Sequence, residues 1–133
     1  IMKLILASYF EEDNHGNGRK IGVAPSKPKD LPYDCDFVFS HLSPEDLYWE
    51  YHKNKKNDPE LAGKIFVENF EAKLKDFSNA VVKEAEEKGI SNLEVLPFKD
   101  GDTLLSWEKG GHTSFRTHIA ACLRELGYEV EER

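Results

Sequence analysis

Short apolar runs, separated by polar stretches and by helix-like repeats, form the main pattern of this chain. Each run is rich in residues that favour strands and is bounded by polar, glycine or proline residues. Three prolines lie within 25–32, after the second run, and they exclude regular structure there. Strands are expected at 3–10, 19–24, 35–40, 93–98, 103–107 and 128–130, with the faintest pattern at 93–98.

A capping sequence marks the first helix start. Ser43 has the hydroxyl of an N-cap residue, Pro44 takes the first helical position, and Asp46 stands three residues after the cap. The helix is expected to continue to about Lys53.

A longer helical segment follows. Asp58 and Pro59 repeat the capping chemistry, and apolar residues then recur three and four positions apart until Gly89. The pattern leaves open whether 58–88 is one helix or two helices that meet near Asp76.

A third helix, expected at 114–126, separates the strands at 103–107 and 128–130. Strands that alternate with helices predict a mostly parallel sheet covered on both sides. A length of 133 residues is typical of one domain. We therefore expect a single α/β domain over 1–133, with three layers and a central sheet of about five strands flanked by helices.

The formal net charge of −7 narrows the range of partners. Binding to a nucleic-acid polymer requires an excess of Lys and Arg, whereas this chain has the opposite excess. Nucleic-acid polymers are therefore excluded as predicted partners. A small anionic ligand stays compatible, because one or two well-placed cations suffice for it.

Cysteine usage and hydropathy indicate a reduced, cytoplasmic protein. Cys35 and Cys122 both lie in apolar runs and are expected to be core thiols. The chain shows neither a secretion signal nor an apolar stretch long enough to cross a membrane. It also shows no residue spacing typical of a metal site, so neither a metal nor a cofactor is predicted.

Ligands of parallel sheets bind beyond the carboxyl ends of the strands. That rule selects Ser8 and Tyr9 after the first strand, His41 after the third, and 108–114 after the strand at 103–107.

The segment at 108–114 has the chemistry of an anion site. Gly110 and Gly111 allow a ligand to approach the backbone closely, and the amides that open the next helix attract negative charge. Arg116 adds a guanidinium that suits phosphate or carboxylate. The candidate ligand-binding residues are Ser8, Tyr9, Trp107, Lys109, Gly110, Gly111, Thr113, Ser114 and Arg116.

Each of these features also fits a structural role. A pair of glycines before a helix can be only a tight turn, and Thr113 or Ser114 can be only its N-cap. Arg116 can form a surface ion pair with Glu108. His41, beside an N-cap, can be a structural histidine.

Three motifs in this order resemble the family known as domain of unknown function 488. They are Met2–Phe10, His41–Pro44 at the start of a helix, and Leu104–Lys109 followed by Arg116. Members of that family begin with a short strand that ends in a Ser-Tyr-Phe-like turn, and they carry Leu-Ala/Ser-Pro before a helix. Late in the chain they have Leu-Leu-Cys-x-Glu-Lys and then Cys-His-Arg. The resemblance implies an α/β fold more firmly than a reaction.

The departures from the family pattern concern reactive groups. Ser106 stands in place of the strand cysteine, and Ser114-Phe115-Arg116 stands in place of Cys-His-Arg. If the family uses its Cys-His pair for catalysis, this chain has lost that pair. A serine without a neighbouring base is a poor nucleophile. The retained arginine and glycine loop suit binding.

The leading hypothesis is a protein that binds a small anionic ligand, above all a nucleotide or nucleotide-derived signal, and so sequesters or senses it. Arg116 and the loop at 110–114 would bind phosphate, and Tyr9 or Trp107 would stack on a base. A small acidic domain with a degenerate catalytic motif would fit a phage protein that sequesters a nucleotide signal of host defence.

Two alternatives belong to other functional classes. The first is a hydrolase or transferase acting on a nucleotide-like substrate, with Glu108 as general acid or base, Arg116 as anion clamp and His41 or His112 assisting. The second is a protein-interaction module that uses the helical region 44–88 and its aromatic residues. A homo-oligomer is expected on the same grounds.

Overall fold

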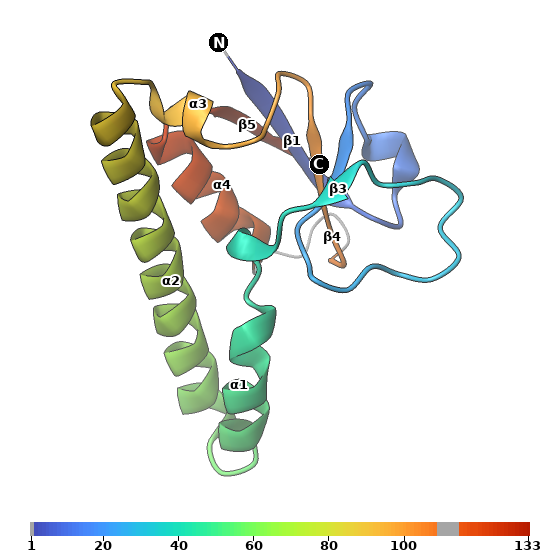
Figure 1. Cartoon of the computed structure of the whole chain (residues 1–133). Coiled ribbons are helices and arrows are strands. Elements are labelled where there is room, and N and C mark those ends of the chain that lie inside the picture. The colour runs from blue at the N-terminus through green and yellow to red at the C-terminus, as the bar shows by residue number, and fades with distance from the viewer. Residues whose placement is uncertain (1, 109–114) are drawn as a thin grey trace.

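The computed structural model describes residues 2–108 and 115–133. Within these residues five strands form one sheet, in the order β3-β2-β4-β1-β5, and every neighbouring pair is parallel (Figure 1). The predicted α/β fold class is confirmed. The strands are β1 (Lys3–Ser8), β2 (Lys20–Gly22), β3 (Phe37–Val38), β4 (Thr103–Ser106) and β5 (Glu129–Glu132).

The helices are α1 (Tyr48–Lys55), α2 (Pro59–Lys88), α3 (Asn92–Val95) and α4 (Phe115–Glu125), with short 3-10 turns η1 (Glu12–Asn14), η2 (Ser40–Leu42) and η3 (Glu45–Leu47). Helices α1 and α2 form an antiparallel hairpin that extends beyond the sheet (Figure 1). None of the helices in the described residues combines the length and the apolar composition needed to cross a membrane.

The long segment at 58–88 is one helix of 30 residues. Its start is capped by Asp58, whose Oδ1 accepts a hydrogen bond from the Leu61 amide at 3.1 Å. It ends at Gly89, which has a φ of 65° in the left-handed region. Ala62, Phe66, Phe70, Leu74, Ser78, Val81 and Ala85 form its buried face.

The strand predicted at 93–98 is wrong, because a capping box turns part of this segment into α3. Ser91 is the N-cap residue, and the Glu94 carboxylate accepts a hydrogen bond from the Ser91 amide at 3.3 Å. Leu96 and Phe98 then bury their side chains in the core without joining the sheet.

The helix predicted to start at Ser43 also differs in detail. The Ser43 hydroxyl accepts a hydrogen bond from the Glu45 amide at 3.1 Å, but the first turn is the 3-10 turn η3. Regular α-helix begins at Tyr48.

The two faces of the sheet are covered by different kinds of structure. Leu4 and Leu6 of β1 pack into a cluster with residues of α2 and α4. Ile5 and Ala7 point to the opposite face, where residues of 31–35, an irregular segment, cover them. Parallel strands are buried on both faces, and alternate residues serve each face. Figure 1 shows α2 and α4 on one side of the sheet and the β2–β3 connection on the other.

The strand order places a topological switch between β2 and β4. From β2 the chain passes to its neighbour β3, with the 31–35 segment covering one face. From β4 it passes the other way to β5, through α4 on the opposite face. Connections that diverge in this way leave a crevice beyond the carboxyl ends of the two strands.

A buried tyrosine packs closely against a glycine in this sheet. The Tyr9 side chain is 1% exposed, and burial raises the pKa of its phenol well above the usual range. Within the described residues its hydroxyl has no hydrogen-bond partner. A Cβ atom added at Gly22 would overlap this hydroxyl oxygen. Space, not backbone conformation, therefore favours glycine at this position.

We expect Gly22→Ala to lower the free energy of unfolding by about 1–3 kcal/mol, because the tightly packed Tyr9 ring must shift. Tyr9→Phe removes the overlapping oxygen together with an unsatisfied buried group, so alone it should be neutral or stabilising. The double variant should regain most of the lost stability in urea titrations. Purely additive losses would contradict the proposed contact.

Candidate functional site

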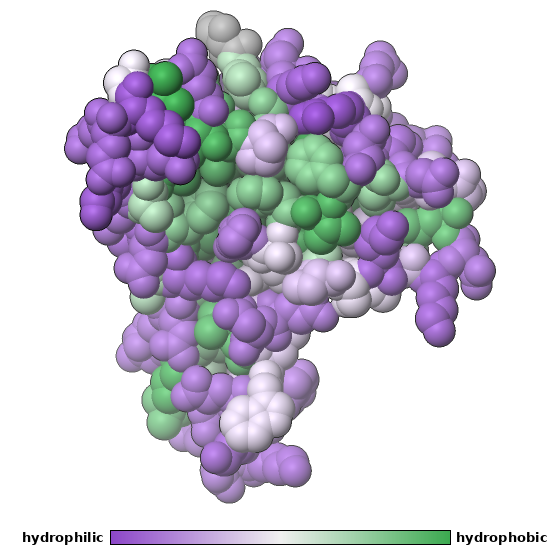
Figure 2. Space-filling model, viewed as in Figure 1, coloured by the Kyte–Doolittle hydropathy of each residue, from purple (hydrophilic) through white to green (hydrophobic). Residues whose placement is uncertain are grey.

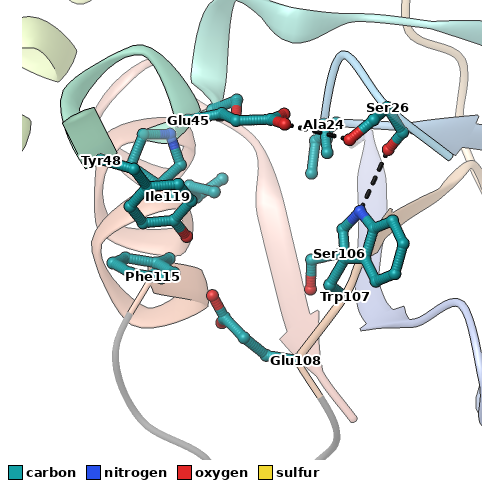
Figure 3. A pocket seen from close by; sticks show the side chains of 12 residues that line it. Ala24, Ser26, Glu45, Tyr48, Ser106, Trp107, Glu108, Phe115 and Ile119 are labelled. Carbon is teal, nitrogen blue, oxygen red and sulfur yellow. Dashed lines mark hydrogen bonds between the residues drawn. The ribbon is translucent and has the colours of Figure 1, made fainter. Parts of the chain in front are cut away.

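A cavity of about 260 Å³ lies at the carboxyl ends of β2 and β4, at the topological switch. Residues that follow each of these strands line it, together with η3, the first residue of α1 and the first turns of α4 (Figure 3). The cavity thus lies where the strand order of a parallel sheet favours ligand binding.

Aromatic side chains form much of the wall. Tyr48 of α1 and Phe115 of α4 are on one side of the cavity in Figure 3, with ring centroids 5.8 Å apart, and Trp107 is on the other. Tyr48 also stacks on Phe66 of α2, with ring centroids 5.5 Å apart. Three helices therefore position one wall, and the end of β4 positions the opposite one.

Two carboxylates also line the cavity. Glu45 comes from η3, and Glu108 follows β4. Burial raises the pKa of Tyr48 to about 12, with further contributions from the negative charges of Glu108 and Glu45. The phenol therefore keeps its proton at neutral pH and can act as a hydrogen-bond donor.

Hydrogen bonds join the two sides of the rim. The Ser26 hydroxyl donates to Oε1 of Glu45 at 3.0 Å, and Nε1 of Trp107 donates to the Ser26 carbonyl oxygen at 3.0 Å (Figure 3). The segment after β2 is thereby tied both to η3 and to the end of β4. These bonds position one carboxylate and one aromatic wall relative to each other.

The cavity contains polar atoms that a ligand can satisfy. Ser106 is only 8% exposed and lines the cavity, and its hydroxyl has no hydrogen-bond partner among the described residues. Oε2 of Glu45 is also buried and has no hydrogen-bond partner within residues 2–108 and 115–133. Buried polar groups are rarely left unsatisfied, and a bound ligand is one common partner.

The structure brings Trp107 and Glu108 of the predicted site into this cavity. Lys109, Gly110, Gly111, Thr113 and Ser114 lie outside the described residues. That part of the predicted anion site therefore stays a prediction.

Arg116 is in a different place from the predicted phosphate clamp. It is 5% exposed, and its Nη1 donates to the Arg133 carbonyl oxygen at 2.8 Å and to the Leu6 carbonyl oxygen at 3.5 Å. It is not among the residues that line the cavity. Its observed contacts are structural, linking α4 to β1 and to the end of the chain.

The other predicted residues in the described part of the chain do not line the cavity, although the Tyr9 ring centroid lies 6.3 Å from that of Trp107. Ser8 is fully buried, and strand alternation turns Tyr9 to the opposite face of the sheet. His41 lies in η2 and lines a separate groove of about 400 Å³ between α2 and α3, beside Phe39 and Phe77. Figure 2 shows apolar side chains gathered in the middle of the viewed face, whereas hydrophilic ones dominate its periphery.

Sequence reasoning missed Glu45, Tyr48 and Ser26 as site residues. Glu45 and Tyr48 follow Ser43-Pro44 and fit helix-start chemistry, while Ser26 lies in a proline-rich segment. Applying the strand-end rule to the second strand would have selected the region of Ser26. Glu45 and Tyr48 reach the cavity only because of the order of the strands in the sheet, which the sequence pattern does not give.

The charged groups of the lining have one sign. Glu45 and Glu108 line the cavity, and no Lys, Arg or His does so among the described residues. The described residues also contain no group of three or more His, Cys, Asp or Glu that could bind a metal ion. The described lining therefore disfavours a phosphate inside the cavity.

The region 44–88, predicted as an interaction module, exposes the large hydrophobic side chains of Trp49, Leu61 and Val67, and Trp49 is the most exposed of the three. Trp49 of α1 is 73% exposed, and Nζ of Lys53 lies 5.3 Å from the centroid of its ring. An interaction role and a homo-oligomer stay predictions.

Comparisons with protein-family models, with curated protein sequences and with solved structures gave no match. The resemblance to the domain of unknown function 488 thus stays an expectation from its motifs.

Proposed function

We propose that this protein binds a small ring compound that carries hydroxyl or amine groups, a nucleoside in particular, in the cavity beyond β2 and β4. The single observation that carries the proposal is the lining itself. It combines aromatic walls with two carboxylates and a serine hydroxyl that has no hydrogen-bond partner among the described residues. Aromatic faces suit a base, and carboxylates accept hydrogen bonds from sugar hydroxyls and amines.

The size and charge of the cavity support a nucleoside over a nucleotide. A volume of about 260 Å³ lies just below the range of about 300–1,000 Å³ that is common for drug-sized ligands. Glu45 and Glu108 would repel a phosphate inside it. The proposed ligand therefore keeps the sugar and the base of the nucleotide expected from the sequence. Any phosphate attached to it would lie outside the described lining.

The test is a thermal-shift and calorimetric comparison of nucleosides, their 5′-monophosphates, free bases and free sugars. A ligand at 100 times its dissociation constant stabilises the folded state by about 2.7 kcal/mol, which the melt would detect. We expect a nucleoside to bind more tightly than its monophosphate. The reverse order would overturn the proposed charge preference.

Glu45→Gln tests whether the cavity is the binding site. Losing a hydrogen bond to a charged group costs about 1.5–3 kcal/mol, so the affinity should fall by about ten- to a hundredfold. Glu50→Gln is the matched control, because Glu50 is exposed and is absent from the lining. Equal affinities of the two variants would place the ligand elsewhere.

A further inference from the structure

Glu45 and Glu108 line the same cavity although they come from distant parts of the chain. Glu45 lies in η3 and Glu108 follows β4, yet both raise the pKa of the same Tyr48 phenol. Figure 3 shows their side chains at opposite edges of the cavity, with Tyr48 and Phe115 along one side. A ligand in the cavity would therefore lie within reach of two carboxylates.

The negative charge of the two carboxylates favours some classes of reaction over others. Hydrolysis of phosphate or carboxyl esters develops negative charge, which is stabilised by cations or by a set of hydrogen-bond donors. Cleavage of a glycosidic bond develops positive charge on the sugar, and a pair of carboxylates is the usual machinery for it. The described lining has two carboxylates and no cationic side chain. It therefore suits cleavage at a glycosidic carbon.

We propose that this cavity hydrolyses the bond between the sugar and the base of the nucleoside; this proposal rests on the binding function proposed above. The oxygen of a water molecule bonds to the anomeric carbon while the carbon–nitrogen bond breaks, and the electron pair of that bond leaves with the base nitrogen. Glu45 takes a proton from the water, and Glu108 gives a proton to the nitrogen. The products are the free sugar and the free base, and proton exchange with solvent restores both carboxyl groups.

Contacts in the cavity support these roles. The Ser26 hydroxyl donates to Oε1 of Glu45 and holds the carboxylate in place, and Oε2 has no partner among the described residues. Glu45 can therefore accept the proton of water. Tyr48, with its pKa raised to about 12, is too weak an acid to protonate the leaving base at neutral pH. Of the described titratable side chains that line the cavity, Glu108 remains as the acid.

The experiment incubates the protein with saturating purine and pyrimidine nucleosides and measures released base and sugar by chromatography. We expect the unaltered protein to release both in equal amounts. Glu45→Gln and Glu108→Gln should each lower kcat by about 10²–10⁴-fold, the range for a lost general acid or base. Glu50→Gln should keep the full kcat. Circular dichroism confirms that each variant is folded, and glutamine preserves the shape of the side chain.

Each result separates this proposal from the binding proposal. A nucleoside that binds and is recovered intact overturns hydrolysis and leaves binding in place. Release of base that persists in both glutamine variants overturns the assigned roles. Absence of binding by every nucleoside overturns both proposals. An O-glycoside cleaved in place of the nucleosides, with the same loss in both variants, supports the carboxylate pair and overturns the nucleoside as its substrate.

Discussion

Replacing Phe70 with alanine is expected to lower the free energy of unfolding by about 3–5 kcal/mol. Phe70 is 1% exposed near the middle of α2. Its ring centroid lies 5.8 Å from that of Phe115 and 5.9 Å from that of His118, both on α4. Truncation removes buried apolar surface and leaves a cavity where the two helices meet. Because Phe115 also forms a wall of the proposed site, nucleoside affinity should fall as well.

Urea or guanidinium titration measures this loss. Trp49→Ala is a suitable control, because it removes a larger aromatic ring that is 73% exposed. Its effect should stay within about 0.5 kcal/mol, as for most surface substitutions. Equal losses for the two variants would mean that α2 does not pack on the sheet layer as described.

Replacing Arg116 with alanine is expected to lower the free energy of unfolding by about 2–3 kcal/mol without changing nucleoside affinity. The buried guanidinium donates to the carbonyl oxygens of Arg133 and Leu6, and hydrogen bonds to charged groups contribute about 1.5–3 kcal/mol. Its removal leaves these carbonyl groups short of a donor. The residue does not line the cavity, so binding should persist.

Arg124 provides the matched control on the same helix. Its Nη2 donates to the Val130 carbonyl oxygen at 2.8 Å, but its side chain is 48% exposed, so Arg124→Ala should cost no more than about 1 kcal/mol. Denaturant titration and calorimetry on both variants separate the two roles. Unchanged stability together with lost ligand binding in Arg116→Ala would restore the anion clamp expected from the sequence.

Sequence signals between near neighbours predicted the helix whose start, length and end depend on such neighbours alone. The cap at Asp58, the apolar repeat and the stop at Gly89 place α2 within one residue of its observed ends. The strand predicted at 93–98 was wrong because two local signals compete in this segment. Its apolar residues favour a strand, whereas the capping box of Ser91 and Glu94 favours a helical turn, and the helical turn prevailed.

The candidate site was predictable only in part. The rule that ligands bind at strand ends selected the end of β4, where Trp107 and Glu108 line the cavity. It could not select Glu45 or Tyr48, because their approach to Glu108 depends on β4 inserting between β2 and β1. Arg116 was misleading for the same reason. Its spacing from the glycine loop fits an anion site, but Leu6 of β1 and Arg133, the residue after β5, supply the carbonyl groups that it binds.

The α/β class and the alternation of strands and helices follow from the sequence alone, as does the acidic character from which we expect no nucleic-acid polymer as a partner. These properties follow from hydrophobic periodicity, capping and composition, which act between near neighbours in the chain. The strand order, the cover on each face of the sheet and the placement of Glu45 and Glu108 in one cavity emerge only in the folded chain. These depend on long-range packing, in which residues more than 60 positions apart in the sequence become neighbours in one cavity.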